Sequence, residues 1–574
     1  MPAATHQEQK LFFEQVRKGF GSALVRTGEV LRDFELAGVH LRLRFAGEAL
    51  VSALTNGLAC PVSSVPPVFR SNRQPCEICI WDSESTGVEP ASPPRHRWDF
   101  TGRGSIWGFH DPQYKSAFSW AEGSVSVMDS NTGQAVYWLP SQRSLPLWLM
   151  AAPLRTILHW CMDLNGRQLV HGAAVGHGGR GVLMPGRGGA GKSSTALACL
   201  ESGLDFVADD YLALVLDPAP CAFPLYATAK LDPRSLDLYP RLSTGCRIVT
   251  EPGFNKVILF LKDSYTDQLP PSLPIGQILQ PSITNSPVTE VDRLKPREAL
   301  KALAAETLVH LPHSGARTAE FLERLSSTVP CAKLRLGTVR SEIPRVVRAA
   351  IAAPPAVSSS ESPRADVRPY VSLIVHYSEP DPGELEALAL AIEADRYPRT
   401  ELVVTVCGAG PEFVEQASHL PGLVRVLRFE EPVWTAFAWN RAIRESFADW
   451  LFFLEPGDRL VEGALDALVQ SARQKPAAAW IRGQCSESPD RPLRGALVKK
   501  GAFLECGLFN LRFVGREQQE WVARAKRAEL IGRDTLTRSL CRPPAAASCD
   551  TFGNTASRVM KTWKNVRPDT PESV

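Results

Sequence analysis

The sequence predicts an α/β protein of several domains, and three observations lead to this fold class. Its 574 residues fit two to four domains of ordinary size. Strand-like apolar runs alternate with helix-like segments in two stretches, 146–351 and 370–545. Between them, residues 352–369 are rich in Pro, Ser and Ala without periodicity, which is typical of a linker. Residues 1–145 are mostly strand-like and predict a β-rich N-terminal domain, whereas 546–574 predict a flexible tail.

The composition is that of an ordinary globular protein and excludes some classes of partner. The net charge is +3, with 64 basic and 61 acidic residues, which gives no sign of a nucleic-acid groove or of binding to an anionic membrane surface. The first ten residues lack the apolar core of a signal peptide. The 13 cysteines are scattered along the chain, which favours a cytoplasmic protein with reduced thiols.

The most apolar long run is 145–164. A proline and three polar residues interrupt it: Pro153, Arg155, His159 and Asp163. We therefore expect one amphipathic helix there and no membrane span.

The N-terminal region shows strands separated by turns. Residues 37–45 alternate apolar and polar side chains, and 124–128 and 134–138 read as two arms of a hairpin. Cys76 and Cys79 have the spacing of half a zinc site or of a redox pair. No second pair completes a tetrahedral ligand set, so we expect buried structural thiols.

The strongest functional signal lies in residues 181–195. An apolar strand over 182–184 is followed by a glycine-rich turn and by a helix that begins at Lys192. From Gly186 to Ser193 the chain matches G-x-x-x-x-G-K-[ST], in which backbone N–H groups surround phosphates, the lysine reaches the β/γ oxygens and the hydroxyl faces Mg²⁺. The segment predicts binding of ATP with Mg²⁺ by Gly186, Gly188, Gly189, Gly191, Lys192, Ser193 and Ser194.

Two further strands end in residues suited to acid–base chemistry. One strand ends at His171, and a third, from Leu204, ends at Asp209 and Asp210. Because ligands lie beyond the carboxyl ends of strands in parallel α/β sheets, we expect both carboxylates at the same edge as Lys192. One would hold Mg²⁺ and the other would take a proton from an attacking hydroxyl. The alternatives are a capping or solvated pair of aspartates and a core histidine.

His171-Gly, the P-loop and Ala208-Asp-Asp together resemble the catalytic domain of HPr kinase/phosphorylase, a bacterial protein-serine kinase with a P-loop. The resemblance is specific over residues 165–215 and loose to about 350. It implies that His171, Asp209 and Asp210 flank the reacting phosphate, with one aspartate as the base and the histidine assisting, and with Mg²⁺ on Ser193 and Asp209.

The chain lacks the glycine-rich, arginine-bearing segment with which that family holds its carrier protein. The phosphoryl acceptor is therefore left open as a protein, a peptide or a small molecule. Lys230 and Lys256 are candidates either for reaching phosphate or for ordinary solvated lysines. The rest of this domain is predicted as strands at 257–261 and 275–279 and helices at 296–305 and 318–327.

The second half opens with a strand at 370–376, a helix at 383–394 and a strand at 397–406. With Trp439-Asn440 and a strand ending in Glu455-Pro-Gly-Asp458, this region resembles family 2 glycosyltransferases of the GT-A fold, which is Rossmann-like. In that family the strand ends in an acidic cluster that holds a metal ion on the diphosphate of a nucleotide sugar.

This second resemblance implies that Glu455 and Asp458 hold Mn²⁺ or Mg²⁺, although Gly457 replaces the middle carboxylate of the motif. It also implies that Glu520 is the catalytic base, since it falls where the family places a carboxylate. A solvated helix face is the alternative for Glu517 and Glu520, which lie three residues apart.

Two functions are consistent with these features. The first is a bifunctional modifying enzyme, in which an ATP-dependent kinase is joined to a glycosyltransferase that uses a nucleotide sugar. The second is an ATP-binding switch whose degenerate GT-A domain is a non-catalytic scaffold. The sequence leaves the acceptor, the sugar donor and the oligomeric state open.

Overall fold

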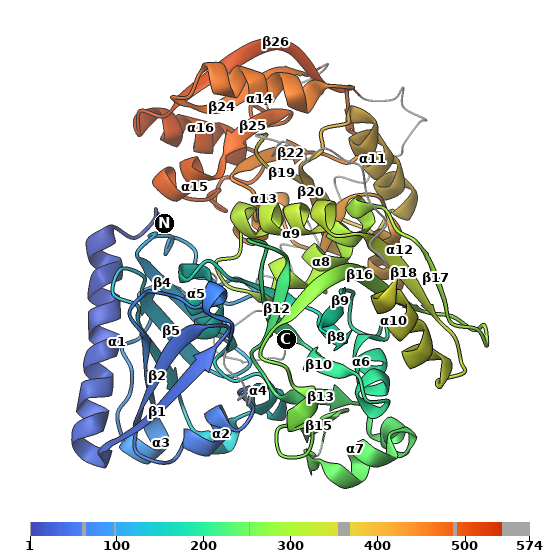
Figure 1. Ribbon diagram of the computed structural model, residues 1–574. Coiled ribbons are helices and arrows are strands. Elements are labelled where there is room, and N and C mark those ends of the chain that lie inside the picture. Colours follow the sequence, from blue (N-terminus) through green and yellow to red (C-terminus); the bar gives the residue numbers. More distant parts are fainter. Residues whose placement is uncertain are drawn as a thin grey trace. The chain divides into compact units, whose positions relative to one another are not determined.

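The fold is described from a computed structural model, which describes residues 2–59, 65–96, 99–251, 253–353, 368–485 and 491–541. The chain forms two compact units (Figure 1). Residues 4–366 make the N-terminal unit, and 367–574 make the C-terminal unit, to which 1–3 also belong. Both units are mixed α/β structures. Most of the predicted linker, 352–369, and the whole predicted tail, 546–574, lie outside the described residues.

The first sheet of the N-terminal unit has six strands in the order β1-β2-β3-β6-β5-β4. They are β1 (Glu29–Leu36), β2 (Val39–Ala46), β3 (Cys76–Asp82), β4 (Tyr114–Ser119), β5 (Ser124–Asp129) and β6 (Gln134–Leu139). The predicted hairpin is confirmed, since β5 and β6 pair antiparallel. Helix α1 (His6–Thr27) packs on one face, where it meets Val136 and Trp138, whereas Tyr137 and Leu139 face the opposite core. This alternation is what a two-residue side-chain period produces.

The second sheet of this unit has nine strands and is mixed. They are β7 (Gln168–His171), β8 (Ala173–His177), β9 (Arg180–Met184), β10 (Asp205–Ala208), β11 (Tyr211–Val215), β12 (Cys221–Pro224), β16 (Leu273–Ile283), β17 (Glu290–Arg293) and β18 (Cys331–Leu336). A separate small sheet contains β13 (Thr228–Leu231), β14 (Arg247–Val249) and β15 (Val257–Phe260). The remaining helices are α2 (Val51–Thr55), α3 (Ser83–Thr86), α4 (Leu147–Ala151), α5 (Arg155–Leu164), α6 (Lys192–Glu201), α7 (Pro240–Gly245), α8 (Pro296–His310), α9 (Ala316–Thr328) and α10 (Glu342–Ala352).

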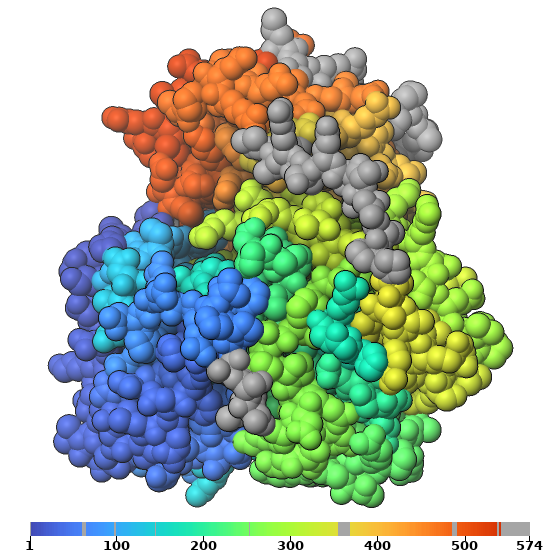
Figure 2. Space-filling view, in the orientation of Figure 1, coloured from blue at the N-terminus to red at the C-terminus, as the bar shows by residue number. Residues whose placement is uncertain are grey.

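Helix α5 joins the two sheets through a common core. Its side chains Ile157, Leu158 and Trp160 are fully buried between the six-stranded sheet and strands β7 and β11. Figure 2 shows the blue surface of the six-stranded sheet adjoining the green surface of the later strands. The predicted boundary between residues 145 and 146 therefore falls inside one compact unit.

The prediction of a single helix over 145–164 is wrong. Two helices, α4 and α5, replace it, and Leu154 between them has a left-handed backbone with φ of 57°. Pro153 explains the break, because proline cannot donate a backbone hydrogen bond and clashes with the preceding turn of a helix.

The C-terminal unit contains one sheet of eight strands in the order β21-β20-β19-β22-β25-β24-β26-β23. They are β19 (Val371–Tyr377), β20 (Thr400–Cys407), β21 (Leu423–Phe429), β22 (Trp450–Leu454), β23 (Arg459–Leu460), β24 (Ala478–Cys485), β25 (Ala496–Lys499) and β26 (Ile531–Cys541). Its helices are α11 (Pro382–Asp395), α12 (Pro411–His419), α13 (Thr435–Glu445), α14 (Ala464–Gln474), α15 (Lys500–Cys506) and α16 (Glu517–Arg527). Strands β21, β20, β19 and β22 are parallel, as predicted for a Rossmann-like opening.

Two buried histidines link the stability of the N-terminal unit to pH. Burial lowers the pKa of His159 to about 3 and that of His313 to about 4. An unfolded chain has a histidine pKa of about 6.5. Between pH 6.5 and 4 the unfolded chain therefore binds more protons than the folded one, so the folded state loses stability as the pH falls.

We expect each of these histidines to lower the free energy of unfolding by up to about 1.4 kcal/mol per pH unit between pH 6.5 and 4. The replacement His313→Asn removes one of these histidines and should therefore reduce the slope of the unfolding free energy against pH. Asparagine suits this position, because His313 has φ of 63° and its Nε2 donates to the Ser116 carbonyl at 2.8 Å. Urea unfolding at pH 7.5, 6.5, 5.5 and 4.5 measures both slopes. Equal slopes for the two proteins would contradict the assignment.

Candidate functional site

The predicted phosphate-binding loop has the expected local structure. It connects β9 to α6, and Gly191 just before α6 has φ of +99°. A Cβ atom at Gly191 would lie 2.3 Å from Leu336 Cδ1, whose side chain would have to shift, and the left-handed backbone itself favours glycine. Gly186, at the start of the loop, has φ of +146°. Gly188 and Gly189 lie within the same loop, and Ser194 is exposed on the first turn of α6.

Lys192 is buried and folds back over this loop. Its Nζ donates to the carbonyl oxygens of Gly186 at 2.5 Å and of Arg187 at 3.0 Å. Burial lowers the pKa of Lys192, and the negative charges of Glu306 and Asp209 act in the opposite direction. The ammonium group is thus held at the glycine-rich turn, with carboxylates close enough to influence it.

The predicted edge for the aspartates is confirmed, but the sheet that creates it is mixed and not parallel. Strand β8 lies between β9 and β10 and is antiparallel to both. Strands β9 and β10 therefore run in the same direction, and their carboxyl ends meet at one edge. Lys192 follows β9 and Asp209 follows β10, so both belong to this edge.

Asp209 is almost fully buried, with 4% of its surface exposed. Its Oδ2 accepts a hydrogen bond from the Lys230 backbone N–H at 2.8 Å, whereas Oδ1 has no hydrogen-bond partner among the described residues. Burial raises the pKa of Asp209, and a hydrogen bond with Ser193 acts against this rise. A buried carboxylate oxygen beside the Ser193 hydroxyl is a suitable oxygen ligand for Mg²⁺.

Asp210 has a different environment from Asp209. Its Oδ1 lies 3.0 Å from His171 Nε2, and its Oδ2 lies 2.5 Å from Lys230 Nζ. Burial raises the pKa of Asp210, but the charge of Lys230 and the hydrogen bond and charge of His171 outweigh burial and hold it well below its usual value. Asp210 is therefore ionised and held on both sides.

His171 is positioned by three neighbours besides Asp210. Its backbone N–H donates to Thr307 Oγ1 of α8 at 3.1 Å, and its ring meets Tyr211 edge-on with the centroids 5.1 Å apart. The ring of His310 is 6.1 Å away, centroid to centroid. His171 Nδ1 is buried and has no hydrogen-bond partner among the described residues. If Nε2 carries the proton toward Asp210, Nδ1 is left as a proton acceptor.

Glu306, which was not among the predicted site residues, also lies near Lys192 and His171. Its Oε2 is 2.8 Å from His310 Nε2. Burial raises the pKa of Glu306, but His310, His171 and Lys192 together lower it to about 2. The predicted helix ended at residue 305, whereas α8 continues to His310. A glutamate and a histidine four residues apart were the available signal, because residues at this spacing share one helix face.

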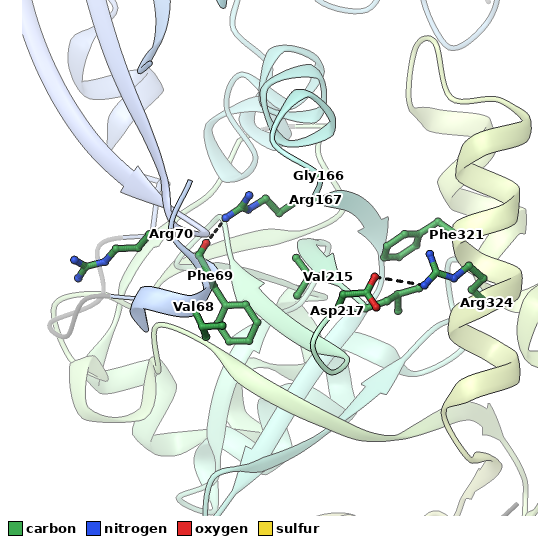
Figure 3. A pocket seen from close by; sticks show the side chains of 10 residues that line it. Val68, Phe69, Arg70, Gly166, Arg167, Val215, Asp217, Phe321 and Arg324 are labelled. Atoms are coloured by element: carbon green, nitrogen blue, oxygen red, sulfur yellow. Dashed lines mark hydrogen bonds and ion pairs between the residues drawn. The ribbon is translucent and has the colours of Figure 1, made fainter. Parts of the chain in front are cut away.

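A pocket of about 270 Å³ lies where β7 begins and β11 ends, at the opposite ends of these strands from His171 and Tyr211 (Figure 3). Its buried Arg167 donates to the backbone carbonyls of Ala37, at 3.1 Å, and of Asn165 and Phe69. Its lining residues are Val68, Phe69, Arg70, Gly166, Arg167, Val215, Leu216, Asp217, Phe321 and Arg324, and no predicted site residue is among them. We assign Arg167 to holding these loops together.

In the C-terminal unit the predicted metal motif lies where the strand order changes direction. The chain runs from β19 to β20 and β21 on one side, and β22 pairs with β19 on the other. In open α/β sheets, ligands bind outside the carboxyl ends of the strands at such a position. Tyr377 ends β19, and Glu455 directly follows β22.

Both predicted metal ligands are paired with arginines. Arg491 donates a hydrogen bond to Glu455 Oε1. Arg494 donates through Nε to Asp458 Oδ2 at 3.0 Å and through Nη2 to Oδ1, and its Nε lies 3.8 Å from Glu455 Oε2. Asp458 Oδ2 also accepts from the Glu455 backbone N–H at 2.9 Å.

A third ion pair adjoins these two. Arg459 donates to both carboxylate oxygens of Glu384 at 3.2 and 2.6 Å, and to the Asp458 carbonyl at 2.9 Å. We call the three pairs the arginine–carboxylate cluster: Glu384, Glu455, Asp458, Arg459, Arg491 and Arg494. Its three positive charges balance its three negative charges. In this arrangement Glu455 and Asp458 do not offer free carboxylate oxygens to a divalent cation.

The two arginines at the motif differ in how firmly they are held. The side chains of Asp458 and Arg494 are 0% and 4% exposed, whereas that of Arg491 is 48% exposed. Removing one partner of a buried ion pair costs about 3–5 kcal/mol, whereas an exposed pair contributes about 0–1 kcal/mol. Arg491 can therefore leave Glu455 at a small cost, and Arg494 cannot leave Asp458 in the same way.

Glu520, the predicted base, is also paired. Its Oε1 and Oε2 accept hydrogen bonds from Arg524 at 3.0 and 2.8 Å on the same face of α16. Gln518 of this helix accepts from the Leu493 backbone N–H at 2.9 Å and connects α16 to the segment that carries Arg494. The role of Glu520 as a base stays a prediction. To act as a base, the Glu520 carboxylate would have to leave its ion pair with Arg524.

Comparison with known proteins leaves the family open. No protein-family model matches the chain, and no curated protein matches it. Staphylococcus aureus TarS 1–349 is similar at 11% identity and a TM-score of 0.26, over 30% of this chain and 59% of that one. The mannosyltransferase PcManGT from Pyrobaculum calidifontis, solved with GDP-Man and Mn²⁺, is similar at 16% identity and a TM-score of 0.26, over 34% of this chain and 61% of that one.

The chain thus spans about three fifths of the length of these two structures. Similarity at this level does not bear on the chemistry of either unit. Within the described residues, no helix combines the length and the apolar character that crossing a membrane requires.

We expect Arg494→Ala to destabilise the C-terminal unit by about 3–5 kcal/mol, because it removes the guanidinium that binds both oxygens of the buried Asp458 carboxylate. The matched variant Arg491→Ala should cost at most about 1 kcal/mol, because its ion pair is half-exposed. Urea unfolding of the full chain measures both. Equal losses for the two variants would show that the difference in burial does not govern these pairs.

Proposed function

We propose that the N-terminal unit binds ATP with Mg²⁺ and transfers the terminal phosphoryl group to a hydroxyl of a protein, a peptide or a small molecule. The observation that carries this proposal is the meeting of a glycine-rich loop and its lysine with buried acid–base groups at one sheet edge. Lys192 comes from the end of β9, and Asp209 and Asp210 come from the end of β10. Phosphoryl transfer depends mainly on positioning and on charge stabilisation, and these groups can supply both.

Ser193 and Asp209 fit the part of the site that holds Mg²⁺. The unpartnered Oδ1 of Asp209 and the hydroxyl of Ser193 are hard oxygen ligands, and Mg²⁺ usually takes only one or two protein ligands besides phosphate and water. Bound Mg²⁺ would offset the charge of the phosphates. Lys192 would leave the loop carbonyls to bind the β/γ oxygens.

The pair of His171 and Asp210 is suited to moving the proton. Asp210 accepts from His171 Nε2 and fixes the ring, as a carboxylate does in other aspartate–histidine pairs. His171 Nδ1 would take the proton of the attacking hydroxyl. At the same time the hydroxyl oxygen would bond to the γ-phosphorus of ATP, and ADP would leave. Lys230 holds Asp210 ionised throughout.

For the C-terminal unit we propose transfer of a sugar from a nucleotide sugar. Its parallel strand order and the position of Glu455 and Asp458 at the change of strand direction support a ligand site there. The second candidate, an ATP-binding switch with a scaffold domain, is favoured by the arginines that occupy both carboxylates and by the pairing of Glu520 with Arg524.

Calorimetric titration of ATP–Mg²⁺ into the full chain tests the nucleotide site. We expect Lys192→Ala to weaken binding by about 10- to 150-fold, because hydrogen bonds to charged groups contribute about 1.5–3 kcal/mol. The control is Lys10→Ala, an exposed lysine of α1 paired with Glu14 at 3.9 Å, and it should bind as the wild type does. Unchanged binding in Lys192→Ala would refute the proposed site.

The proposed Mg²⁺ ligand Asp209 and the proposed base His171 predict two different phenotypes. Asp209→Asn should weaken the dependence of ATP binding on Mg²⁺. His171→Asn should leave ATP binding intact and slow ATP turnover by about 10²- to 10⁴-fold, the usual contribution of a general base. Calorimetry with and without Mg²⁺, together with ADP formation, measures both. Normal turnover in His171→Asn would exclude this histidine as the base.

A further inference from the structure

We propose that the C-terminal unit binds the diphosphate group of its nucleotide without a divalent cation, and that Arg491 supplies the positive charge. This inference rests on the proposed function of that unit as a nucleotide-sugar site. It departs from what the sequence resemblance implies, which is a metal ion held by Glu455 and Asp458. The contacts of those two carboxylates are the reason for the departure.

Asp458 is unsuited to a metal ion because its oxygens are already used. Arg494 bonds to both of them, and Oδ2 also accepts the Glu455 backbone N–H. A divalent cation would have to displace a guanidinium from a pair that is almost fully buried on both sides. This displacement would remove the main ion pair of a buried guanidinium.

Arg491 is the guanidinium of the arginine–carboxylate cluster that can move most easily. Its side chain is half-exposed, and its ion pair is with Glu455, the residue that directly follows β22. Arg459 is bound to both oxygens of Glu384, and Arg494 is buried. The planar fork of an arginine matches phosphate oxygens and supports two parallel hydrogen bonds.

The release of Arg491 does not leave Glu455 without a positive neighbour. Arg494 Nε stays 3.8 Å from Glu455 Oε2. The cluster would therefore keep two carboxylates near Arg494 and offer the charge of Arg491 to the diphosphate.

Tyr377 provides a second observation that indicates a ligand at this place. It is the last residue of β19, 3% exposed, and its hydroxyl has no hydrogen-bond partner among the described residues. Burial raises the pKa of Tyr377, so the hydroxyl stays protonated and can donate. Glu384, Arg459 and Asp458 are close enough to act on it electrostatically. A buried polar atom without a partner is uncommon unless a ligand or water satisfies it.

The experiment is a calorimetric titration of UDP and of GDP into the full chain, once in EDTA and once with Mn²⁺. All proteins carry Lys192→Ala, so that the phosphate-binding loop of the N-terminal unit does not contribute. We expect one of the nucleotides to bind with the same dissociation constant, within about twofold, in both conditions. Arg491→Ala should then weaken binding at least tenfold, equivalent to about 1.4 kcal/mol.

Glu455→Gln separates the two mechanisms because they predict opposite signs. If Arg491 binds the diphosphate, removing the competing carboxylate should tighten binding several-fold. If a metal ion binds it, removing a metal ligand should weaken or abolish binding. Arg396→Ala is the matched control, since this arginine is 82% exposed and has only a 3.7 Å ion pair with Glu462. It should leave binding unchanged.

Binding that requires Mn²⁺ and is lost in Glu455→Gln would overturn the inference and leave the nucleotide-sugar function standing. Absence of binding of both nucleotides, in EDTA and in Mn²⁺, would overturn the proposed function of the unit together with the inference. Unchanged binding in Arg491→Ala would exclude this residue as the source of the charge. Circular dichroism of each variant confirms that it is folded.

Discussion

Asp210 carries a largely buried negative charge, with 24% of its side chain exposed, and its two ion pairs organise the candidate site of the N-terminal unit. Burying an ionised carboxylate without partners is so unfavourable that the group becomes protonated instead. Lys230 and His171 prevent this, and they come from strands β13 and β7 on different parts of the chain. The contact with Asp210 also fixes the imidazole ring of His171. Asp209, one residue earlier, lacks such partners and has a raised pKa, so two adjacent aspartates have different chemistry.

The same constraint has the opposite consequence in the C-terminal unit. There the buried carboxylate of Asp458 is satisfied by Arg494, and Glu455 is satisfied by Arg491. The pairing uses the oxygens that a metal ion would need. A motif that suggests a metal site in the sequence is thereby a charge-balanced cluster in the folded protein. In the N-terminal unit, by contrast, one oxygen of Asp209 has no hydrogen-bond partner among the described residues, which supports the Mg²⁺ site proposed there.

The architecture shows how the N-terminal residues are connected to the candidate site. The six-stranded sheet and strands β7 and β11 bury their apolar faces on the same helix, α5. Strand β7 ends at His171, and β11 begins directly after Asp210, so the shared core also positions both members of the His171–Asp210 pair. The first 145 residues therefore contribute to the geometry of the site without supplying any of its predicted groups.

The sequence by itself determined the local features. Glycine spacing predicted the loop between β9 and α6, because Gly191 has the left-handed backbone that glycine adopts most readily. Apolar periodicity predicted most strands and helices, because side-chain direction follows the period of the backbone. Only the tertiary structure decided the rest. These features join residues that are distant in sequence. They are the antiparallel strand β8 between β9 and β10, the pairing of Asp210 with Lys230, the position of Glu306, and the arginines on Glu455 and Asp458. Such contacts depend on strand pairing and burial, and these set the charge state of each group. No local pattern of residues in the sequence encodes them.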